Sequence, residues 1–147
     1  MAKSVREAAM DMLSRREHSR YELQHKLEHK GYDTDEVESA LQRLMEENLQ
    51  SDERFVESFV HSRRERGSGP RKIAAELSQK GVSETLIFHY LDERSPLWID
   101  RAVQVRVRKF GQALPADFKE KARQMRFLQQ RGFTAEQIQN AVRDDDL

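Results

Sequence analysis

The chain has 147 residues with 26 basic and 26 acidic side chains, and charged residues make up 35% of it, against a usual share of about 25%. It has no cysteine, which excludes disulfides and thiolate metal sites. There is no apolar leader after Met1 and no apolar run of about 18 residues, so we expect a cytoplasmic protein that does not enter the membrane. Glycine and proline are scarce, which favours an all-α fold.

The first third of the chain predicts three helices. A capping-box pattern opens at Ser4, and an apolar stripe continues to about Arg15. A second capping box opens at Ser19, and the helix that follows it ends before Gly31. A third helix begins at Asp33. Its predicted inner face holds Val37, Leu41, Leu44 and Met45.

The middle third predicts the same arrangement. A helix from about Asp52 runs to Arg66, where the turn 67–70 breaks it. Pro70 suits the first turn of the next helix, because its missing N–H would have no helical partner there. Gly81 ends that helix and Ser83 caps the closing one. The predicted inner faces hold Phe55, Val56, Phe59, Val60, Ile73, Leu77, Ile87, Tyr90 and Leu91.

The last third contains one conflict between patterns. Residues 103–108 alternate apolar and polar side chains, which by itself predicts a strand. The repeat, however, requires a helix at this place in the third unit. We therefore predict a helix for this segment. A further helix from about Ala116 ends at Gly132, and a capping box at Thr134 opens the last one. The predicted inner faces hold Ile99, Val103, Val107 and Phe110 on the first helix and Phe118, Ala122, Met125 and Leu128 on the second, and Trp98 also suits the core.

One motif occurs three times: Leu-x-x-(Lys/Arg)-Gly followed by an apolar or aromatic residue, at 27–32, 77–82 and 128–133. A glycine at this place predicts a helix stop of the Schellman type, with the basic residue at the negative end of the helix dipole. Eight positions before each glycine lie Leu23, Ile73 and Gln124, and we expect Met125 and Phe127 to replace the glutamine in the core. The repeat predicts three tandem three-helix units in an elongated, curved arrangement: residues 1–49, 50–94, and 95–147 with a short acidic tail.

The sequence gives little support for catalysis. Gly67-Ser68-Gly69 lacks the spacing of a phosphate-binding loop and follows a helix, so a turn explains it. His25 and His29 have a spacing that can hold Zn²⁺, but no third ligand accompanies them, and we expect solvated histidines. The predicted protein is not an enzyme, and it has no cofactor and no metal.

Basic side chains are the more informative feature. Residues 96–143 hold 10 basic and 4 acidic side chains, an excess that local carboxylates cannot neutralise. A solvated helix face is the plain interpretation, and a surface for phosphates or for an acidic protein groove is the functional one. The predicted partner-binding residues are Arg63, Arg64, Arg66, Arg71, Lys72, Arg101, Arg106, Arg108, Lys109, Lys119, Lys121, Arg123 and Arg126.

Three runs of residues resemble the RecX family. They are Leu-Ser-Arg-Arg-Glu-His-Ser-Arg-x-Glu-Leu-x-x-Lys-Leu at 13–27, the segment 52–81 with Asp-x-Arg-Phe and Gly-Pro-x-Lys-Ile-x-x-Glu-Leu-x-x-Lys-Gly, and Arg-Phe-Leu-x-x-Arg-Gly-Phe at 126–133. Together they cover nearly the whole chain in order. The resemblance implies tandem three-helix repeats and a bacterial regulator that binds along the groove of the RecA filament on single-stranded DNA.

By the same resemblance, the regulator inhibits strand exchange, ATP hydrolysis and the coprotease activity of the recombinase. We expect a monomer that contacts the RecA filament and that can also contact single- or double-stranded DNA. Two alternatives stay open. One is a direct nucleic-acid-binding helical module, against which the neutral total charge counts; the other is a helical-repeat adaptor for another partner.

Overall fold

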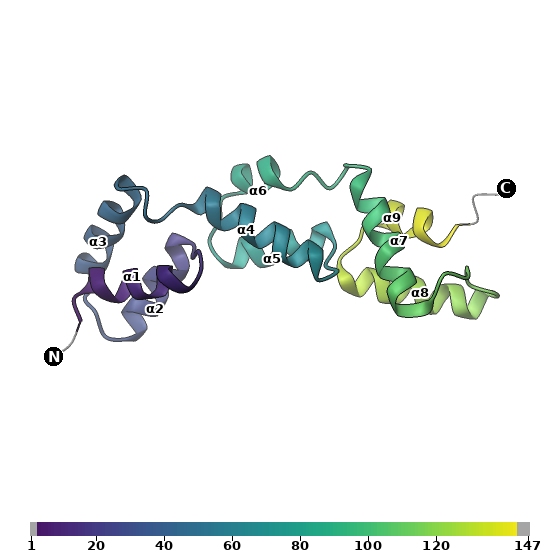
Figure 1. The fold of residues 1–147 in the computed structure, drawn as a ribbon, viewed down its shortest axis with the longest axis horizontal. Helices are drawn as coiled ribbons and strands as arrows, with labels where there is room; N and C mark the ends of the chain where they lie inside the picture. Colours follow the sequence, from purple (N-terminus) through teal and green to yellow (C-terminus); the bar gives the residue numbers. More distant parts are fainter. Residues whose placement is uncertain (1–2, 144–147) are drawn as a thin grey trace. The chain divides into compact units, whose positions relative to one another are not determined.

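The computed structural model describes residues 3–143, which form nine α-helices and no strand in that range (Figure 1). The predicted all-α fold is confirmed, and residues 103–108 lie in a helix. The elements are α1 (Val5–Arg15), α2 (Arg20–His29), α3 (Thr34–Glu46), α4 (Asp52–Glu65), α5 (Pro70–Gln79), α6 (Glu84–Tyr90), α7 (Leu97–Phe110), α8 (Phe118–Arg131) and α9 (Ala135–Val142). No helix within this range has the length and apolar character needed to cross a membrane. The predicted acidic tail lies outside the described residues.

The helix starts follow the local sequence. Ser4, Ser19 and Thr134 each form a complete capping box, in which the cap side chain and the third helical residue exchange hydrogen bonds with the backbone. Asp33 and Asp117 cap α3 and α8 with a single side-chain bond each. These bonds satisfy N–H groups that the first turn of a helix leaves without a partner.

The helix stops are confirmed as Schellman motifs. The N–H of Gly31 donates to Glu28 O at 2.9 Å, and the N–H of Tyr32 donates to Leu27 O at 3.2 Å. The same pair of bonds recurs at Gly81 and Gly132. These glycines have φ of 99°, 74° and 98°, a left-handed region that other residues enter at a cost.

The described chain divides into two compact units, each with its own packing. The first contains the residues up to Phe59 together with Leu77–Tyr90, and the second contains Val60–Glu76 together with the chain from Leu91 on. The middle repeat therefore contributes to both units. The boundaries predicted for the three repeats stay predictions.

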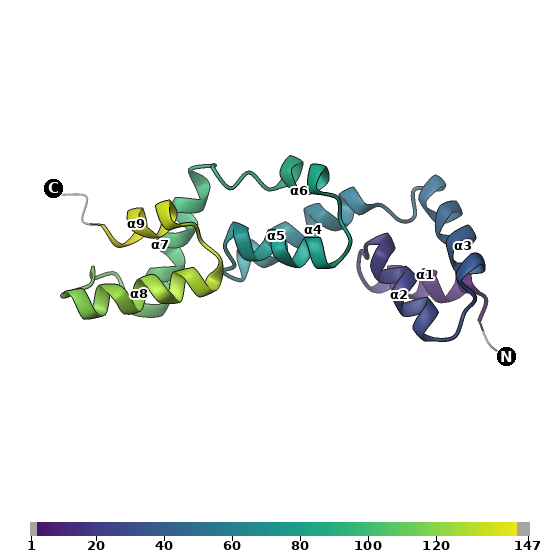
Figure 2. The same cartoon turned by 180° about the vertical axis from the view of Figure 1, so that it is seen from behind.

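In the first unit, α1, α2 and α3 pack against one another, as Figure 1 and Figure 2 both show. Leu23, Leu27 and Leu41 are fully buried in this core. Met45 was predicted to face inward but is 41% exposed, because Leu44 already occupies the buried face of α3 at that level. Phe59 and Tyr90 are half-buried rather than buried.

In the second unit, α7, α8 and α9 pack together (Figure 1). The buried stripe of α7 consists of Trp98, Ala102 and Arg106, spaced by four residues. The stripe predicted for this helix, at 99, 103, 107 and 110, is half-buried. Periodicity identified the helix correctly and placed its core face one residue out of register, because apolar side chains occupy two adjacent stripes of α7.

Gln124 also differs from its prediction. It is only 3% exposed and occupies the buried position that Leu23 and Ile73 fill in the other repeats. Its side-chain amide donates to Glu120 at 3.2 Å, which satisfies part of the buried polar group. Met125 and Phe127 are half-buried and do not replace it. The third repeat thus keeps the register of the others.

Two of the three stops also pack against a neighbouring repeat. A side chain at Gly81 would overlap Tyr21 in the first turn of α2, and one at Gly132 would overlap Lys72 in the first turn of α5. At Gly132 the contact includes backbone bonds, since Gly69 N–H donates to Arg131 O at 2.7 Å and Arg71 N–H donates to Gly132 O at 2.9 Å. Gly31 has no such neighbour. The repeated motif therefore both ends a helix and joins successive repeats.

Candidate anion-binding site

A groove of about 570 Å³ lies in the second unit, between the end of α4, one face of α7 and the end of α8. We call it the basic groove. It is lined by Arg64, Glu65, Arg66, Gly67, Arg101, Gln104, Val105, Arg108, Lys109, Phe127 and Arg131. Six of these side chains are cationic and one is a carboxylate. The structure brings together five of the predicted partner-binding residues here: Arg64, Arg66, Arg101, Arg108 and Lys109.

Three helix ends supply most of these cations. Arg64 lies in the last turn of α4, Arg108 and Lys109 lie in the last turn of α7, and Arg131 is the last residue of α8. The C-terminal end of a helix carries partial negative charge, so each cation is favourably placed on its own helix. This explains how the fold can gather like charges at one place without an equal number of carboxylates.

Ion pairs neutralise only part of the groove. Arg101 pairs with Glu65 at 2.9 Å. Beside the groove, Arg63 pairs with Glu76 at 3.4 Å. Among residues 3–143, no carboxylate lies within ion-pair distance of Arg66 or Arg108, and both side chains are exposed. An excess of positive charge therefore faces solvent, as an anion-binding surface requires.

Phe127 lines the groove and contacts two of its cations. Two cations lie over its ring: the Lys109 ammonium, 5.6 Å from the ring centroid, and the Arg131 guanidinium, 5.2 Å from it. Phe110 meets the same ring edge-on at a centroid distance of 5.3 Å. The face of an aromatic ring is negative and attracts cations, so Phe127 helps to hold these two cations in position. Phe127 and Arg131 were not predicted as site residues, although their spacing of four on α8 indicates a shared face.

The other predicted partner-binding residues are elsewhere. Arg71, Lys121 and Arg126 line a second groove, while Arg63, Lys72, Lys119 and Arg123 line neither. Arg106 must be removed from the predicted surface because it is only 3% exposed. Its guanidinium points into the loop after α7 and donates to Ala113 O at 3.1 Å. It orders that loop and is out of reach of a partner.

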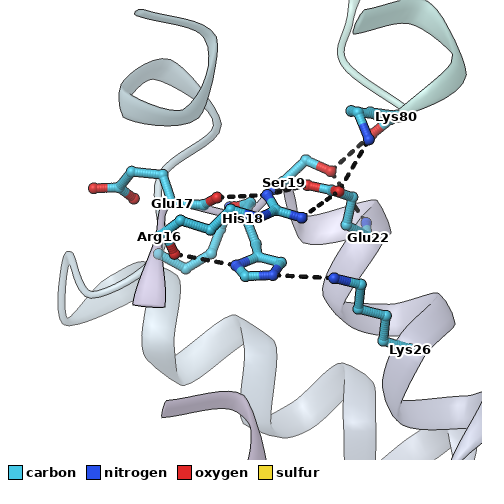
Figure 3. A network of polar contacts seen from close by, with 8 residues as sticks. Arg16, Glu17, His18, Ser19, Glu22, Lys26 and Lys80 are labelled. Atoms are coloured by element: carbon cyan, nitrogen blue, oxygen red, sulfur yellow. Dashed lines mark hydrogen bonds and ion pairs between the residues drawn. The ribbon is translucent and has the colours of Figure 1, made fainter. Parts of the chain in front are cut away.

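The first unit contains a network of polar side chains, three of them buried, that was not predicted from the sequence (Figure 3). Glu22 is 9% exposed and pairs with Arg16 and Lys80, each at 3.1 Å. Ser19 Oγ donates to Lys80 O at 2.8 Å. The network therefore joins the start of α2 to the end of α5. Lys80, which we interpreted only as a C-cap residue, has a second role in it.

The pKa of Glu22 is strongly shifted. Burial by itself raises this pKa, but hydrogen bonds from Arg16, the backbone N–H of Ser19 and Lys80 outweigh it and lower the pKa to about 2. The carboxylate is therefore ionised above about pH 2 and stays charged beside Arg16 and Lys80.

His18 extends the network. It is 3% exposed, with Nδ1 3.1 Å from Arg16 O and Nε2 3.2 Å from Lys26 Nζ. A neutral ring fits both contacts, with Nδ1–H donating and Nε2 accepting. Burial lowers the pKa of His18, and the nearby cations lower it further. The two histidines considered as metal ligands, His25 and His29, are exposed, and no group of three or more potential ligands lies among residues 3–143.

Comparison with known proteins places this arrangement in a family. The chain matches the family models of the first, second and third three-helix domains of RecX, over residues 6–44, 51–90 and 99–142. The Regulatory protein RecX of Halorhodospira halophila (strain DSM 244 / SL1) is 47% identical over 141 residues, which cover 96% of this chain and 88% of that protein. The Regulatory protein RecX of Pseudomonas tolaasii is 44% identical over 144 residues, covering 98% and 93%.

Solved structures agree on the fold. The crystal structure of RecX from Lactobacillus salivarius aligns with a TM-score of 0.78 at 20% identity, covering 94% of this chain and 92% of that one. A crystal structure of regulatory protein RecX aligns with the same TM-score and covers 93% of this chain and 69% of that one. With three matched domains in order and close relatives over almost its full length, the chain belongs to the RecX family of regulatory proteins.

Proposed function

We propose that this chain binds the RecA filament on single-stranded DNA and inhibits strand exchange, ATP hydrolysis and coprotease activity, acting by binding rather than by catalysis. The family supports a regulatory role, since its curated relatives are named Regulatory protein RecX. The observation that carries the proposal is the basic groove, which presents six cations against one carboxylate.

The chemistry of the groove suits two kinds of anion in such a filament. Arginine can form two parallel hydrogen bonds with a phosphate or a carboxylate. Arg66 and Arg108 are exposed, and neither has to break an ion pair with a carboxylate of the described chain before it can bind another anion. We propose that they contact phosphates or acidic side chains of the filament, and that the bound chain obstructs the movements of neighbouring subunits that turnover requires.

The test is the rate of ATP hydrolysis by the recombinase on single-stranded DNA, with increasing amounts of this chain. We expect inhibition near stoichiometric amounts. Arg108→Glu should raise the concentration needed for half inhibition about tenfold or more, because it replaces an attractive charge by a repulsive one.

Arg15→Glu is the matched control. Arg15 is also an exposed arginine in the last turn of a helix, but it lies in the first unit. Both substitutions place a carboxylate near the negative end of a helix dipole, so a difference between them reports on the groove. A chain that does not inhibit at all would contradict the proposed function, and equal inhibition by the two variants would contradict the role of the groove.

Direct binding to DNA is the second candidate, because the cation excess of the groove would also attract bare phosphates. Two cations already lie over the Phe127 ring, so we do not expect a base to stack on it, and the binding would depend on charge. Anisotropy of labelled single-stranded DNA, measured without recombinase over a range of salt concentrations, separates the two functions. Tight binding with a steep salt dependence that Arg108→Glu reduces would favour direct binding.

A further inference from the structure

The second unit has another groove with a different chemistry. It has a volume of about 760 Å³ and lies along α8 and α9. We call it the apolar groove. Phe118, Ala122 and Met125 line it from α8, and Phe133 and Ile138 form its other side. Its rim carries Arg71, Lys121 and Arg126, and none of its lining residues is a carboxylate.

Three residues of the apolar groove were wrongly predicted to lie in the core. Phe118, Ala122 and Met125 were predicted to face the core, but Phe118 is 85% exposed and the other two are half-buried. The buried face of α8 carries Gln124 and Leu128 instead. The apolar stripe of Phe118, Ala122 and Met125 is therefore a second face of this helix, and the rest of the described chain leaves Phe118 exposed and covers the other two only in part. An exposed apolar stripe of this kind marks an interaction surface.

The dimensions indicate a helical partner. On α8 the lining of the groove runs from Phe118 to Gln129, which at about 1.5 Å per residue is roughly 16 Å, or three helical turns. A groove between two helices is the usual receptor for an amphipathic helix, whose apolar residues recur at i, i+4 and i+7. A small ligand would fill only part of this length.

The charges indicate which kind of helix fits. Lys121 and Arg126 lie on α8 beside the apolar stripe, and Arg71 lies on α5 with 66% of its side chain exposed. Arg71 has a carboxylate partner, Glu93, at the long distance of 3.9 Å. Carboxylates flanking the apolar residues of a partner would meet all three cations, whereas a basic helix would be repelled.

From this geometry we propose that the apolar groove binds an acidic amphipathic helix of a partner protein, with one large apolar side chain of that helix packed against Phe118. The basic groove and the apolar groove then have different ligands: the first takes phosphates or single carboxylates, and the second takes a protein segment. The proposal does not depend on the proposed function, because it concerns another surface and another kind of contact.

The experiment measures binding of the full chain to a fluorescein-labelled peptide of about 14 residues, with leucines at i, i+4 and i+7 and glutamates on both flanks. Anisotropy should show saturable binding in the micromolar range. A peptide with lysines in place of the glutamates should not bind. Since neither recombinase nor DNA is present, a failure here is distinct from a failure of the proposed function.

Matched variants locate the binding. Phe118→Ser should weaken it about tenfold, whereas Phe88→Ser should not change it, because Phe88 is also a highly exposed phenylalanine but lies on α6. Arg126→Glu should weaken binding about tenfold, and Lys119→Glu, an exposed position on α8 outside the groove, should leave it within about twofold. All of these positions except Phe88 lie on α8, and all are exposed, so loss of folding does not explain a difference.

Two results would overturn the proposal. If Arg108→Glu in the basic groove weakened peptide binding as much as Arg126→Glu, the peptide would be attracted by overall charge alone. If the peptide bound only to a chain lacking residues 144–147, the chain's own acidic end would be the occupant instead of a partner protein.

Discussion

Glu22 gives the sharpest test of how the first unit is held together. The change is Glu22→Gln, which keeps the shape of the side chain and removes its charge. Glu22 pairs with Arg16 and Lys80, each at 3.1 Å, and is 9% exposed. The substitution leaves two cations without their shared carboxylate beside the start of α2. We therefore expect the single substitution Glu22→Gln to cause a large loss of stability.

The pKa gives the magnitude. The pKa of this carboxyl falls from its ordinary value of 4.5 to about 2. Each tenfold change in proton affinity between the folded and unfolded states corresponds to about 1.4 kcal/mol, so the ionised carboxylate stabilises the fold by about 3 kcal/mol. Because the pKa is lower in the folded state, the unfolded chain binds the proton more tightly. This stabilisation is therefore complete above about pH 5 and is lost as the pH falls from 4.5 towards 2.

The assay is chemical unfolding followed by far-ultraviolet circular dichroism at several pH values between 7 and 2. At pH 7, Glu22→Gln should lower the free energy of unfolding by about 3 kcal/mol, and the variant should lose less further stability on acidification than the parent. Glu38→Gln is the control, since Glu38 is exposed on α3, and it should change the stability by less than about 0.5 kcal/mol. Parallel acid-unfolding curves for Glu22→Gln and the parent chain would refute the reasoning.

Two further predictions concern the second unit and the repeat motif. In thermal unfolding, Gly132→Ala should destabilise the fold by about 3 kcal/mol and Gly31→Ala by only about 1 kcal/mol. Both glycines have positive φ, but only a Cβ at Gly132 would overlap a neighbouring residue, Lys72. Equal losses of stability would show that close packing at Gly132 does not help to join the repeats. Arg106→Ala should cost about 2 kcal/mol, because it removes a buried donor to the loop after α7, whereas the exposed neighbour Arg108→Ala should be nearly neutral. A neutral Arg106→Ala, measured by urea unfolding, would show that this hydrogen bond does not stabilise the loop after α7.

Much of the secondary structure could be predicted from the sequence because its signals are local. A capping box at Ser19 or a Schellman stop at Gly81 depends on residues three to five positions apart, and such bonds form wherever the helix forms. Repetition of the stop motif then indicated three units. The choice of helix over strand at residues 103–108 came from the repeat and not from the local alternation, and the structure confirms it.

Which face of a helix is buried was decided only by the tertiary structure. Periodicity identifies an apolar stripe, but α8 has two, and packing against α7 and α9 covers the one with Gln124 and Leu128. Phe118 is left exposed for that reason. Similarly, α7 buries Arg106 and leaves its neighbours half-buried, since the loop after the helix offers carbonyl groups that a guanidinium can reach.

The candidate site shows the same division between local and distant information. The sequence by itself determined that cations are in excess over residues 96–143. It could not determine that Arg66 and Arg131, which are far apart in the chain, line one groove, or that Glu22 and Lys80 form an ion pair. Those contacts depend on which helix ends meet when the repeats pack, and the order of residues within any one helix carries no information about that.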